Sequence, residues 1–265
     1  MAKILAVTNQ KGGVGKTTTS VNLAASLAAM KQQVLLIDLD PQGNATMGVG
    51  VDKKSLQHTF CDVLLSGLDI RSNRIRIENV GIDLLPSNSD MTAAEVELMR
   101  TPGAEQRLKE KLEPIRNEYD FVLIDCPPAL NMLTLNALNA ADGVIVPIQC
   151  EYYALEGLTA LMETVDQVRS SINPSLRIEG LLRTMFDPRN TLANDVSAQL
   201  VEHFGDKVYR TIVPRNVRLA EAPSYGLPAL LYEKTSRGAL AYLSLAGEML
   251  RRQQKATVAP ASAAV

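Results

Sequence analysis

Near its start the chain reads Lys11-Gly12-Gly13-Val14-Gly15-Lys16-Thr17-Thr18. An apolar run at residues 4–7 precedes this stretch and has the character of a buried parallel strand. Residues 17–30 follow it, rich in Ala and Leu, with apolar positions at helical spacing and no Gly or Pro. A strand, a glycine-rich loop and a helix in this order are typical of a phosphate-binding loop. The glycines let successive N–H groups converge on an anion, and the positive end of the helix adds to that field.

The residue types of this loop suit a nucleotide. Lys16 is placed to reach the β- and γ-phosphates, and the hydroxyl of Thr17 is placed to ligate Mg²⁺. The backbone of residues 11–18 would form the cradle, through Lys11, Gly12, Gly13, Val14, Gly15, Lys16, Thr17 and Thr18. The general pattern G-x-x-x-x-G-K-[ST] is not fully met, because Gln10 stands where the first glycine belongs and is followed by a second lysine, Lys11. The alternative is a glycine-rich turn with an incidental lysine.

Composition favours one large aliphatic core. The chain has 265 residues, of which 46% are hydrophobic and only 4% aromatic, with no Trp. Such a core is typical of sheets covered by helices on both faces. The net charge of −2 gives no overall sign of a nucleic-acid binder, but residues 1–176 carry a net −6 and residues 177–255 a net +4. This basic third is either a surface for a polyanion or ordinary scatter.

Cysteine usage and hydropathy indicate a cytoplasmic protein. Cys61, Cys126 and Cys150 form neither a disulfide framework nor a C-x-x-C metal pattern, which suits a reducing compartment. The first residues read as a strand with no signal peptide. No apolar run approaches the roughly 20 residues that a membrane span needs.

Strand and helix patterns alternate along the chain. Strands are predicted at residues 34–37, 74–77, 82–85, 121–124, 143–148 and 178–185, and helices at residues 60–65, 95–99, 106–116, 155–172, 195–204 and 239–252. The pattern predicts an α/β fold with a single domain over residues 1–252, in which a mostly parallel twisted sheet carries helices on both faces. Residues 253–265, rich in Ala, Pro and Ser, are predicted to be a disordered tail. The basic end of the last helix could dock on a membrane, but packing against the core is the preferred interpretation.

Acidic residues follow two of the predicted strands. Asp125 ends an apolar strand, where a carboxylate can hold the hydration shell of Mg²⁺ while Thr17 binds the ion. Asp38 and Asp40 lie in the string D-L-D-P-Q-G-N, after the strand at residues 34–37. A carboxylate suits phosphoryl transfer, which depends mainly on positioning and charge. The alternative is that Asp38 and Asp40 only form the turn before Pro41.

The string K-G-G-V-G-K-T-T resembles the deviant Walker A motif of the ParA/MinD/NifH family of P-loop ATPases. In that family the extra lysine, here Lys11, crosses a dimer interface and touches the nucleotide of the partner subunit. The string D-L-D-P-Q-G-N resembles switch I, which implies that Asp40 orients the attacking water and that Asp38 supports the magnesium shell or orders the loop. The string D-C-P-P resembles switch II. No iron–sulfur cluster is expected, and Cys126 has no histidine partner that would make it a nucleophile.

The segment P-R-N-V-R-L-A-E-A-P at residues 214–223 is similar to a string of Soj-type ParA proteins. By that resemblance Pro214 and Asn216 border the adenine. Arg218 and Arg189 match positions that contact the DNA backbone, although both could be ordinary solvent-facing arginines. Glu151 lies in a segment that recurs near the dimer interface, where it could meet the partner's ribose or lysine, or could simply cap a helix.

The resemblance spans residues 1 to about 252 and implies the short, chromosomal Soj-like type, without an N-terminal helix-turn-helix extension. It implies an ATPase that binds ATP and Mg²⁺, dimerises on ATP and binds nonspecific double-stranded DNA. A ParB-type protein would stimulate its slow turnover, in the cytoplasm at the nucleoid and without stable membrane association. Two rivals remain, a MinD-like membrane-cycling ATPase and a metabolic P-loop enzyme such as a ligase or kinase.

Overall fold

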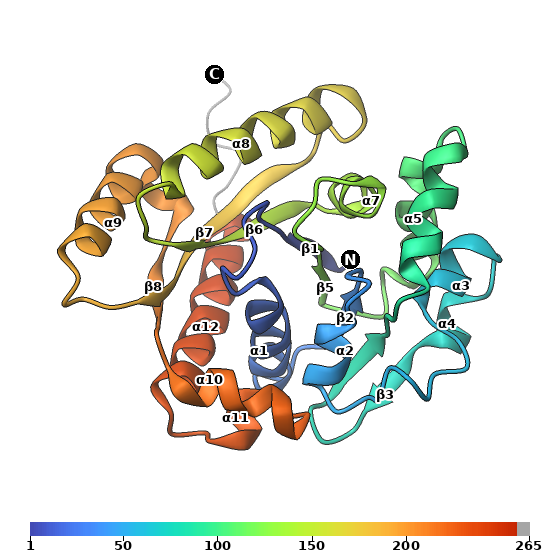
Figure 1. Ribbon diagram of the computed structural model, residues 1–265, viewed down its shortest axis with the longest axis horizontal. Coiled ribbons are helices and arrows are strands. Elements are labelled where there is room, and N and C mark those ends of the chain that lie inside the picture. Colours follow the sequence, from blue (N-terminus) through green and yellow to red (C-terminus); the bar gives the residue numbers. More distant parts are fainter. Residues whose placement is uncertain (259–265) are drawn as a thin grey trace.

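The computed structural model describes residues 1–258, and within them the strands form one eight-stranded sheet in the order β3-β4-β2-β5-β1-β6-β7-β8 (Figure 1). β3 is antiparallel to β4, and the other neighbours pair in parallel. The strands are β1 (Lys3–Val7), β2 (Val34–Asp38), β3 (Ile75–Ile77), β4 (Ile82–Leu85), β5 (Phe121–Asp125), β6 (Gly143–Gln149), β7 (Arg177–Phe186) and β8 (Val208–Pro214). The mostly parallel sheet confirms the predicted fold class.

The helices connect these strands and cover both faces of the sheet (Figure 1). They are α1 (Lys16–Ala29), α2 (Asn44–Gly48), α3 (Phe60–Leu65), α4 (Ile70–Asn73), α5 (Met91–Arg100), α6 (Arg107–Leu112), α7 (Met132–Ala140), α8 (Ala154–Ser171), α9 (Thr191–Phe204), α10 (Val217–Glu221), α11 (Ala229–Tyr232) and α12 (Arg237–Val258). None of the helices within residues 1–258 combines the length and the apolar composition needed to cross a bilayer.

Alternation along the central strand creates two hydrophobic cores. On β1, Ile4 and Ala6 pack with buried residues of α3 and α5–α9, whereas Leu5 and Val7 pack with α1 and α12 on the opposite face. Because the central strands β1, β2 and β5 are apolar on both sides, the sequence shows continuous apolar runs there rather than alternation with polar residues. The closing helix therefore packs on the core, as preferred over a membrane role, with Tyr242, Leu245, Ala246 and Met249 buried.

Strand register brings the predicted acids to one edge of the sheet. β2 and β5 are neighbours, and Asp38 and Asp125 are directly paired positions at their carboxyl ends. Val7, the last residue of β1, pairs with Asp125 on the other side. The phosphate-binding loop, which leaves β1, thus starts beside both carboxylates.

The sequence analysis did not predict α7 and β8, nor the short helices α2, α4, α10 and α11. α7 is buried on most of its circumference, so it lacks the amphipathic stripe that identifies a surface helix, and the side chain of Asn131 caps it by accepting a hydrogen bond from Thr134 N at 3.0 Å. β8 is a strand at the margin of the sheet, and its polar positions at Arg210 and Thr211 obscure the apolar pattern.

α12 extends six residues beyond its predicted end, so residues 253–258 of the expected tail are helical. The remainder of that tail lies outside the described residues.

Side chains of α12 close the outer edge of β8. The carboxylate of Glu248 accepts hydrogen bonds from Arg210 N and Thr211 N, both at 2.9 Å. Arg252, one turn further along, donates to the carbonyl oxygens of Asp206 at 2.8 Å and Val208 at 3.0 Å. An open strand edge is a template for pairing with another chain, and here a helix supplies the missing partners.

Candidate nucleotide-binding site

The loop between β1 and α1 has the backbone that its glycines permit. Gly13 has φ +74° and Gly15, the N-cap of α1, has φ +88°, both in the left-handed region that strains other residues. Lys16 follows as the first residue of α1, so the amino end of this helix points at the loop. The structure thus supplies the strand, loop and helix that the sequence predicted.

Lys16 is buried against its own loop. Its Nζ donates to the carbonyl oxygen of Lys11 at 3.0 Å. Burial lowers the pKa of Lys16, while the nearby carboxylates of Asp125 and Asp40 work in the opposite direction. The ammonium is therefore held where it can exchange a main-chain acceptor for a phosphate oxygen.

Two hydroxyls of α1 converge on Asp125. Thr17 Oγ1 donates to one carboxylate oxygen and Ser20 Oγ to the other, each at 2.8 Å. Burial, with the charge of Asp38 as a second cause, raises the pKa of Asp125. Hydroxyl and carboxylate oxygens are the ligands that a hard cation prefers, so this donor set fits Mg²⁺. Ser20 escaped the sequence analysis, although it lies one helical turn after Lys16 on the same face.

Asp38 orders the loop that carries Asp40. Asp38 is fully buried, and its Oδ2 accepts hydrogen bonds from Thr46 N and Thr46 Oγ1, both at 2.8 Å. Its Oδ1 accepts from Asp40 N at 3.1 Å. Burial raises the pKa of Asp38, against these hydrogen bonds. Of the two roles implied for Asp38, this geometry favours ordering the loop, and a place in the magnesium shell stays a prediction.

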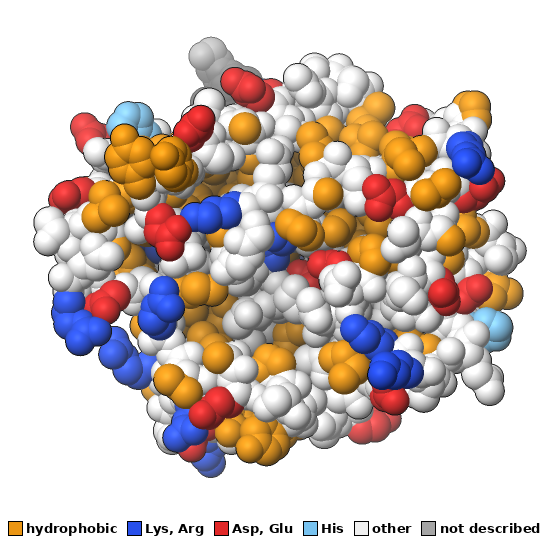
Figure 2. Space-filling model, viewed as in Figure 1, with side chains coloured by type: hydrophobic (Ala, Val, Ile, Leu, Met, Phe, Trp, Pro, Cys, Tyr) orange, Lys and Arg blue, Asp and Glu red, His pale blue; other side chains and the backbone are white. Residues whose placement is uncertain are grey.

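Asp40 and the glycine loop face the same cavity, of about 610 Å³. Figure 2 shows that this face of the molecule is hollowed before the start of α1, with acidic and basic side chains inside. The cavity is lined by Gly12, Gly13, Gly15, Lys16, Thr17, Thr18, Asp40, Pro41, Gln42, Asn44, Thr92, Pro128 and Met185. Asp38 and Asp125 lie beneath this surface, and Asp125 is linked to it through the hydroxyl of Thr17.

A smaller, mostly apolar pocket of about 170 Å³ adjoins this cavity. It is lined by Gly15, Thr18, Thr184, Met185, Val213, Pro214, Arg215, Asn216, Leu219, Ala220 and Tyr242. Gly15, Thr18 and Met185 line both spaces, so the two are continuous. Pro214 and Asn216, for which the resemblance implies contacts with adenine, both line this smaller pocket. Asn216 Oδ1 caps α10 by accepting from Arg218 N at 3.1 Å, which leaves the amide nitrogen as a donor.

Two residues at the end of β7 carry no sequence signal, although Met185 lines both spaces and Thr184 lines the smaller one. Thr184 Oγ1 donates to the carbonyl oxygen of Val14 at 2.8 Å and so fixes the glycine loop to β7. Met185 has φ +49°, a left-handed conformation that is uncommon outside glycine. Such strain is concentrated at functional sites, which is consistent with the position of Met185 between the two pockets.

The side chain of Lys11 is paired with Glu151. Its Nζ lies 2.6 Å from Glu151 Oε2, and the two side chains are 42% and 47% exposed. Lys11 is also not among the residues that line the phosphate cavity within residues 1–258. Glu151, for which the resemblance implied contacts with a partner, contacts the lysine of its own chain.

The two predicted DNA-binding arginines are exposed but paired with acids. Arg189 makes a two-pronged contact with Asp187, with distances of 2.9 and 2.7 Å, and Arg218 Nη1 lies 2.6 Å from Glu221 Oε2. Arg189 also lines a hollow of about 400 Å³ with Arg215 and Arg237, which the sequence analysis did not select. Figure 2 shows basic side chains gathered on this flank, near β8 and α10.

Cys126 lies directly after Asp125 but is not poised for chemistry. The side chain is buried, and burial together with the charge of Asp125 raises the pKa of its thiol well above the usual value. A thiol in this state is a poor nucleophile, in agreement with the sequence analysis.

Comparison with known proteins gives consistent matches. A family described as an AAA domain matches residues 2–178. The sporulation initiation inhibitor protein Soj of Bacillus subtilis (strain 168) is 51% identical, over 94% of this chain and 98% of Soj. The chromosome partitioning protein ParA of Caulobacter vibrioides (strain NA1000 / CB15N) is 49% identical, over 95% of each chain.

Among solved structures, cobyrinic acid a,c-diamide synthase from Mycobacterium smegmatis with a bound ATP analog and magnesium has a TM-score of 0.84 and 37% identity. It covers 97% of each chain. The identity to Soj and ParA is higher and extends over nearly the same length. The chain therefore belongs to the ParA/Soj family of chromosome-partitioning ATPases.

Proposed function

We propose that this protein is an ATP-dependent dimerising switch for chromosome or plasmid partition. In the ATP state two protomers would bind nonspecific double-stranded DNA, and hydrolysis, stimulated by a ParB-type partner and by DNA, would release them. Membership of the ParA/Soj family supports the ATPase activity and the partition role. The steps of the switch rest on the geometry of the site.

The nucleotide would occupy the two continuous pockets, with its phosphates over residues 12–18 and its base between Pro214 and Asn216. Thr17 would hold Mg²⁺ directly, with Asp125 behind it and Asp38 as a further carboxylate. The ion would supply neutralisation of phosphate charge. Lys16 would transfer its hydrogen bond from the carbonyl oxygen of Lys11 to a phosphate oxygen.

The observation that carries the dimer is the position of Lys11. Its side chain is about half exposed and bound to Glu151, and among the described residues it is not part of the lining of the phosphate cavity. A lysine in a phosphate-binding loop that does not serve its own site is available to the site of a second copy. Two protomers facing each other across this surface would each supply a cation to the other's nucleotide.

Dimerisation would turn a weak DNA contact into a useful one. Arg189 and Arg218 lie on the flank that also presents Arg215 and Arg237. Each phosphate contact adds to affinity independently of base sequence, and two linked patches gain effective concentration. Asp187 and Glu221 compete for these guanidinium groups, which would keep the affinity of one protomer low.

Asp40 would position the attacking water. It lines the phosphate cavity and sits on a loop that Asp38 holds through Thr46. The Asp40→Ala variant should bind ATP without hydrolysing it, and with ATP and Mg²⁺ it should be a dimer in light scattering. The double variant Asp40→Ala with Lys11→Ala should be a monomer that still binds nucleotide. Lys109→Ala, an exposed lysine on α6, is the matched control. A trapped protein that binds ATP but stays monomeric would disprove the switch.

The DNA step and the stimulation have separate measurements. Arg218→Glu should abolish ATP-dependent retention of duplex DNA without changing dimerisation; unchanged retention would place the DNA contact elsewhere. ATP turnover should be slow alone and should rise with nonspecific duplex DNA and a ParB N-terminal peptide. The MinD-like alternative predicts flotation with anionic liposomes in ATP, although the apolar face of α12 is already buried against α1 and the sheet.

A further inference from the structure

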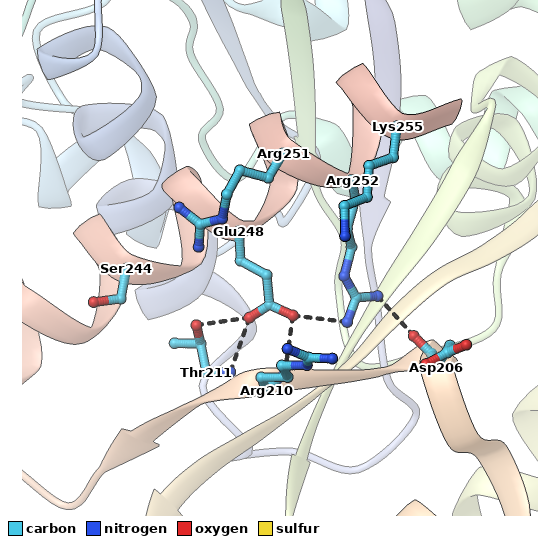
Figure 3. Close-up of a pocket in the computed structure, with 8 residues that line it drawn as sticks. All are labelled: Asp206, Arg210, Thr211, Ser244, Glu248, Arg251, Arg252 and Lys255. Carbon is cyan, nitrogen blue, oxygen red and sulfur yellow. Dashed lines mark hydrogen bonds and ion pairs between the residues drawn. The ribbon is translucent and has the colours of Figure 1, made fainter. Parts of the chain in front are cut away.

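A second basic hollow lies between the last turns of α12 and β8, and Figure 3 shows its residues. It measures about 630 Å³ and is lined by Asp206, Arg210, Thr211, Ser244, Glu248, Arg251, Arg252 and Lys255. Within the described part of the chain, none of these residues lines either pocket of the nucleotide site. The hollow is therefore a separate feature, which neither the nucleotide nor the proposed DNA arginines use.

The floor of the hollow is fixed and internally neutral. Glu248 accepts hydrogen bonds from Arg210 N, Thr211 N and Thr211 Oγ1, and Arg252 Nη2 lies 2.7 Å from Glu248 Oε1. Arg252 is held further by two backbone carbonyl oxygens and lies 4.5 Å above the ring of Tyr209. The negative charge of Glu248 is therefore already satisfied and does not oppose an anion in the hollow.

The rim of the hollow carries basic side chains whose charges are not paired within the described residues. Within residues 1–255, the side chains of Arg210, Arg251 and Lys255 make no ion pair or hydrogen bond. The lining residues together include four cations and two acids, a net charge of +2 in a protein whose overall charge is −2. In Figure 3, Lys255 and Arg252 descend from α12 toward β8, which carries Arg210.

Ordinary explanations account for only part of this arrangement. A lysine in the last turn of a helix complements the helix dipole, which explains Lys255. It does not explain Arg210, which is on a strand. The two acids of the lining do not pair with Arg210, because Glu248 pairs with Arg252 and Asp206 is recorded only through its backbone oxygen, which accepts from Arg252.

We propose that this hollow binds a compact anion that carries two or more phosphate groups. Guanidinium forks and an ammonium group are the side chains that recognise phosphate oxygens. The recess and the carboxylate of Asp206 at its margin favour a small ligand over an extended duplex. Tyr209 is fully buried beneath Arg252, so its ring is not available for a base to stack on. Recognition in this hollow would therefore depend on phosphate groups.

Inorganic tripolyphosphate is the probe. It is titrated calorimetrically into the full-length protein with excess ADP, which occupies the nucleotide site, and without Mg²⁺, which would bind the probe. We expect one binding site per protomer. The double substitution Arg210→Glu with Lys255→Glu should weaken the affinity for tripolyphosphate by about tenfold or more, equivalent to about 1.4 kcal/mol.

The matched control is Arg100→Glu with Lys109→Glu, which makes the same change in net charge on exposed residues of α5 and α6. It should leave tripolyphosphate binding unchanged, and thermal unfolding confirms that both double variants are folded. Absence of binding, or equal weakening in both variants, would overturn the proposal. A third result would also overturn it. In that case tripolyphosphate does not bind, and the double variant Arg210→Glu with Lys255→Glu has lost binding to duplex DNA or to phosphatidylglycerol vesicles. Binding of tripolyphosphate does not require the dimer. Failure of this proposal can therefore be told apart from failure of the proposed function.

Discussion

Lys11 Nζ and Glu151 Oε2 lie 2.6 Å apart within a single protomer, joining the phosphate-binding loop to the turn before α8. Both side chains are about half exposed, and ion pairs of this kind contribute at most about 1 kcal/mol. The pair is therefore strong enough to bias the direction of Lys11 and weak enough to break when a second protomer offers phosphate oxygens.

Glu151→Gln should release Lys11 and strengthen ATP-dependent dimerisation, by up to about fivefold for each pair and therefore up to about thirtyfold for the dimer, which contains two such pairs. The dissociation constant of the trapped dimer is measured by sedimentation. Glu156→Gln, on the exposed side of α8, is the control and should have no effect. A weaker dimer in Glu151→Gln would mean that Glu151 contributes to the interface itself.

Asp40→Ala should reduce ATP turnover by about a hundredfold or more while nucleotide binding persists, because a positioned carboxylate acts on the transition state more than on the ground state. Steady-state phosphate release and equilibrium binding of a fluorescent ATP analogue separate the two effects. Asp52→Ala, an exposed aspartate further along the same loop region, serves as the control. Normal ATP turnover in Asp40→Ala would mean that another group positions the attacking water.

Thr184→Val should loosen the glycine loop, because it removes the hydrogen bond to the carbonyl oxygen of Val14 while preserving side-chain volume. Leaving a buried acceptor unpaired costs about 1–3 kcal/mol. We expect a lower midpoint in urea unfolding and weaker ADP binding. Thr159→Val, on the exposed face of α8, removes only a hydrogen bond within a helix and provides the comparison. Equal effects of both substitutions would argue against a special role for Thr184.

Glu248 should make stability depend on acid pH. Burial works against its charge, but the N–H groups of Arg210 and Thr211, the Thr211 hydroxyl and Arg252 together hold the pKa of Glu248 below its ordinary value of 4.5. A lowered pKa in the folded state stabilises the fold above pH 4.5, and this contribution is lost as pH falls through the folded-state pKa.

Glu248→Gln should flatten that acid dependence and cost about 1–3 kcal/mol near neutral pH, because an amide cannot accept all four donors. Urea unfolding as a function of pH measures both quantities. Glu202→Gln, exposed on α9, should leave the pH profile intact. A profile that is unchanged in Glu248→Gln would show that other carboxylates control acid unfolding.

Local features were predictable and long-range ones were not. The phosphate-binding loop, β2 and β5 could be placed because their signals lie within a few consecutive residues. Register then brought Asp38 beside Asp125, as expected for neighbouring parallel strands. α7 was missed because burial on most sides removes amphipathic periodicity, and β8 was missed because marginal strands carry mixed residues.

The same distinction holds within the site. The glycine loop with Lys16 and Thr17 was identified from one motif, whereas Asp125, which accepts from Thr17, and Thr184, which donates to Val14, come from distant segments. Met185 adopts its left-handed conformation where β7 ends against the loop, and Thr184 donates to a residue 170 positions earlier in the chain. Pairing over such separations depends on tertiary packing, for which a single sequence offers no pattern.

The two continuous pockets have different histories during synthesis. The phosphate cavity draws mainly on residues 12–44, whereas the apolar pocket needs Val213 through Tyr242, which are made much later. A growing chain would therefore possess the glycine loop long before the walls of the apolar pocket exist. The complete pair of pockets forms only when α12, which supplies Tyr242, has been made and docked.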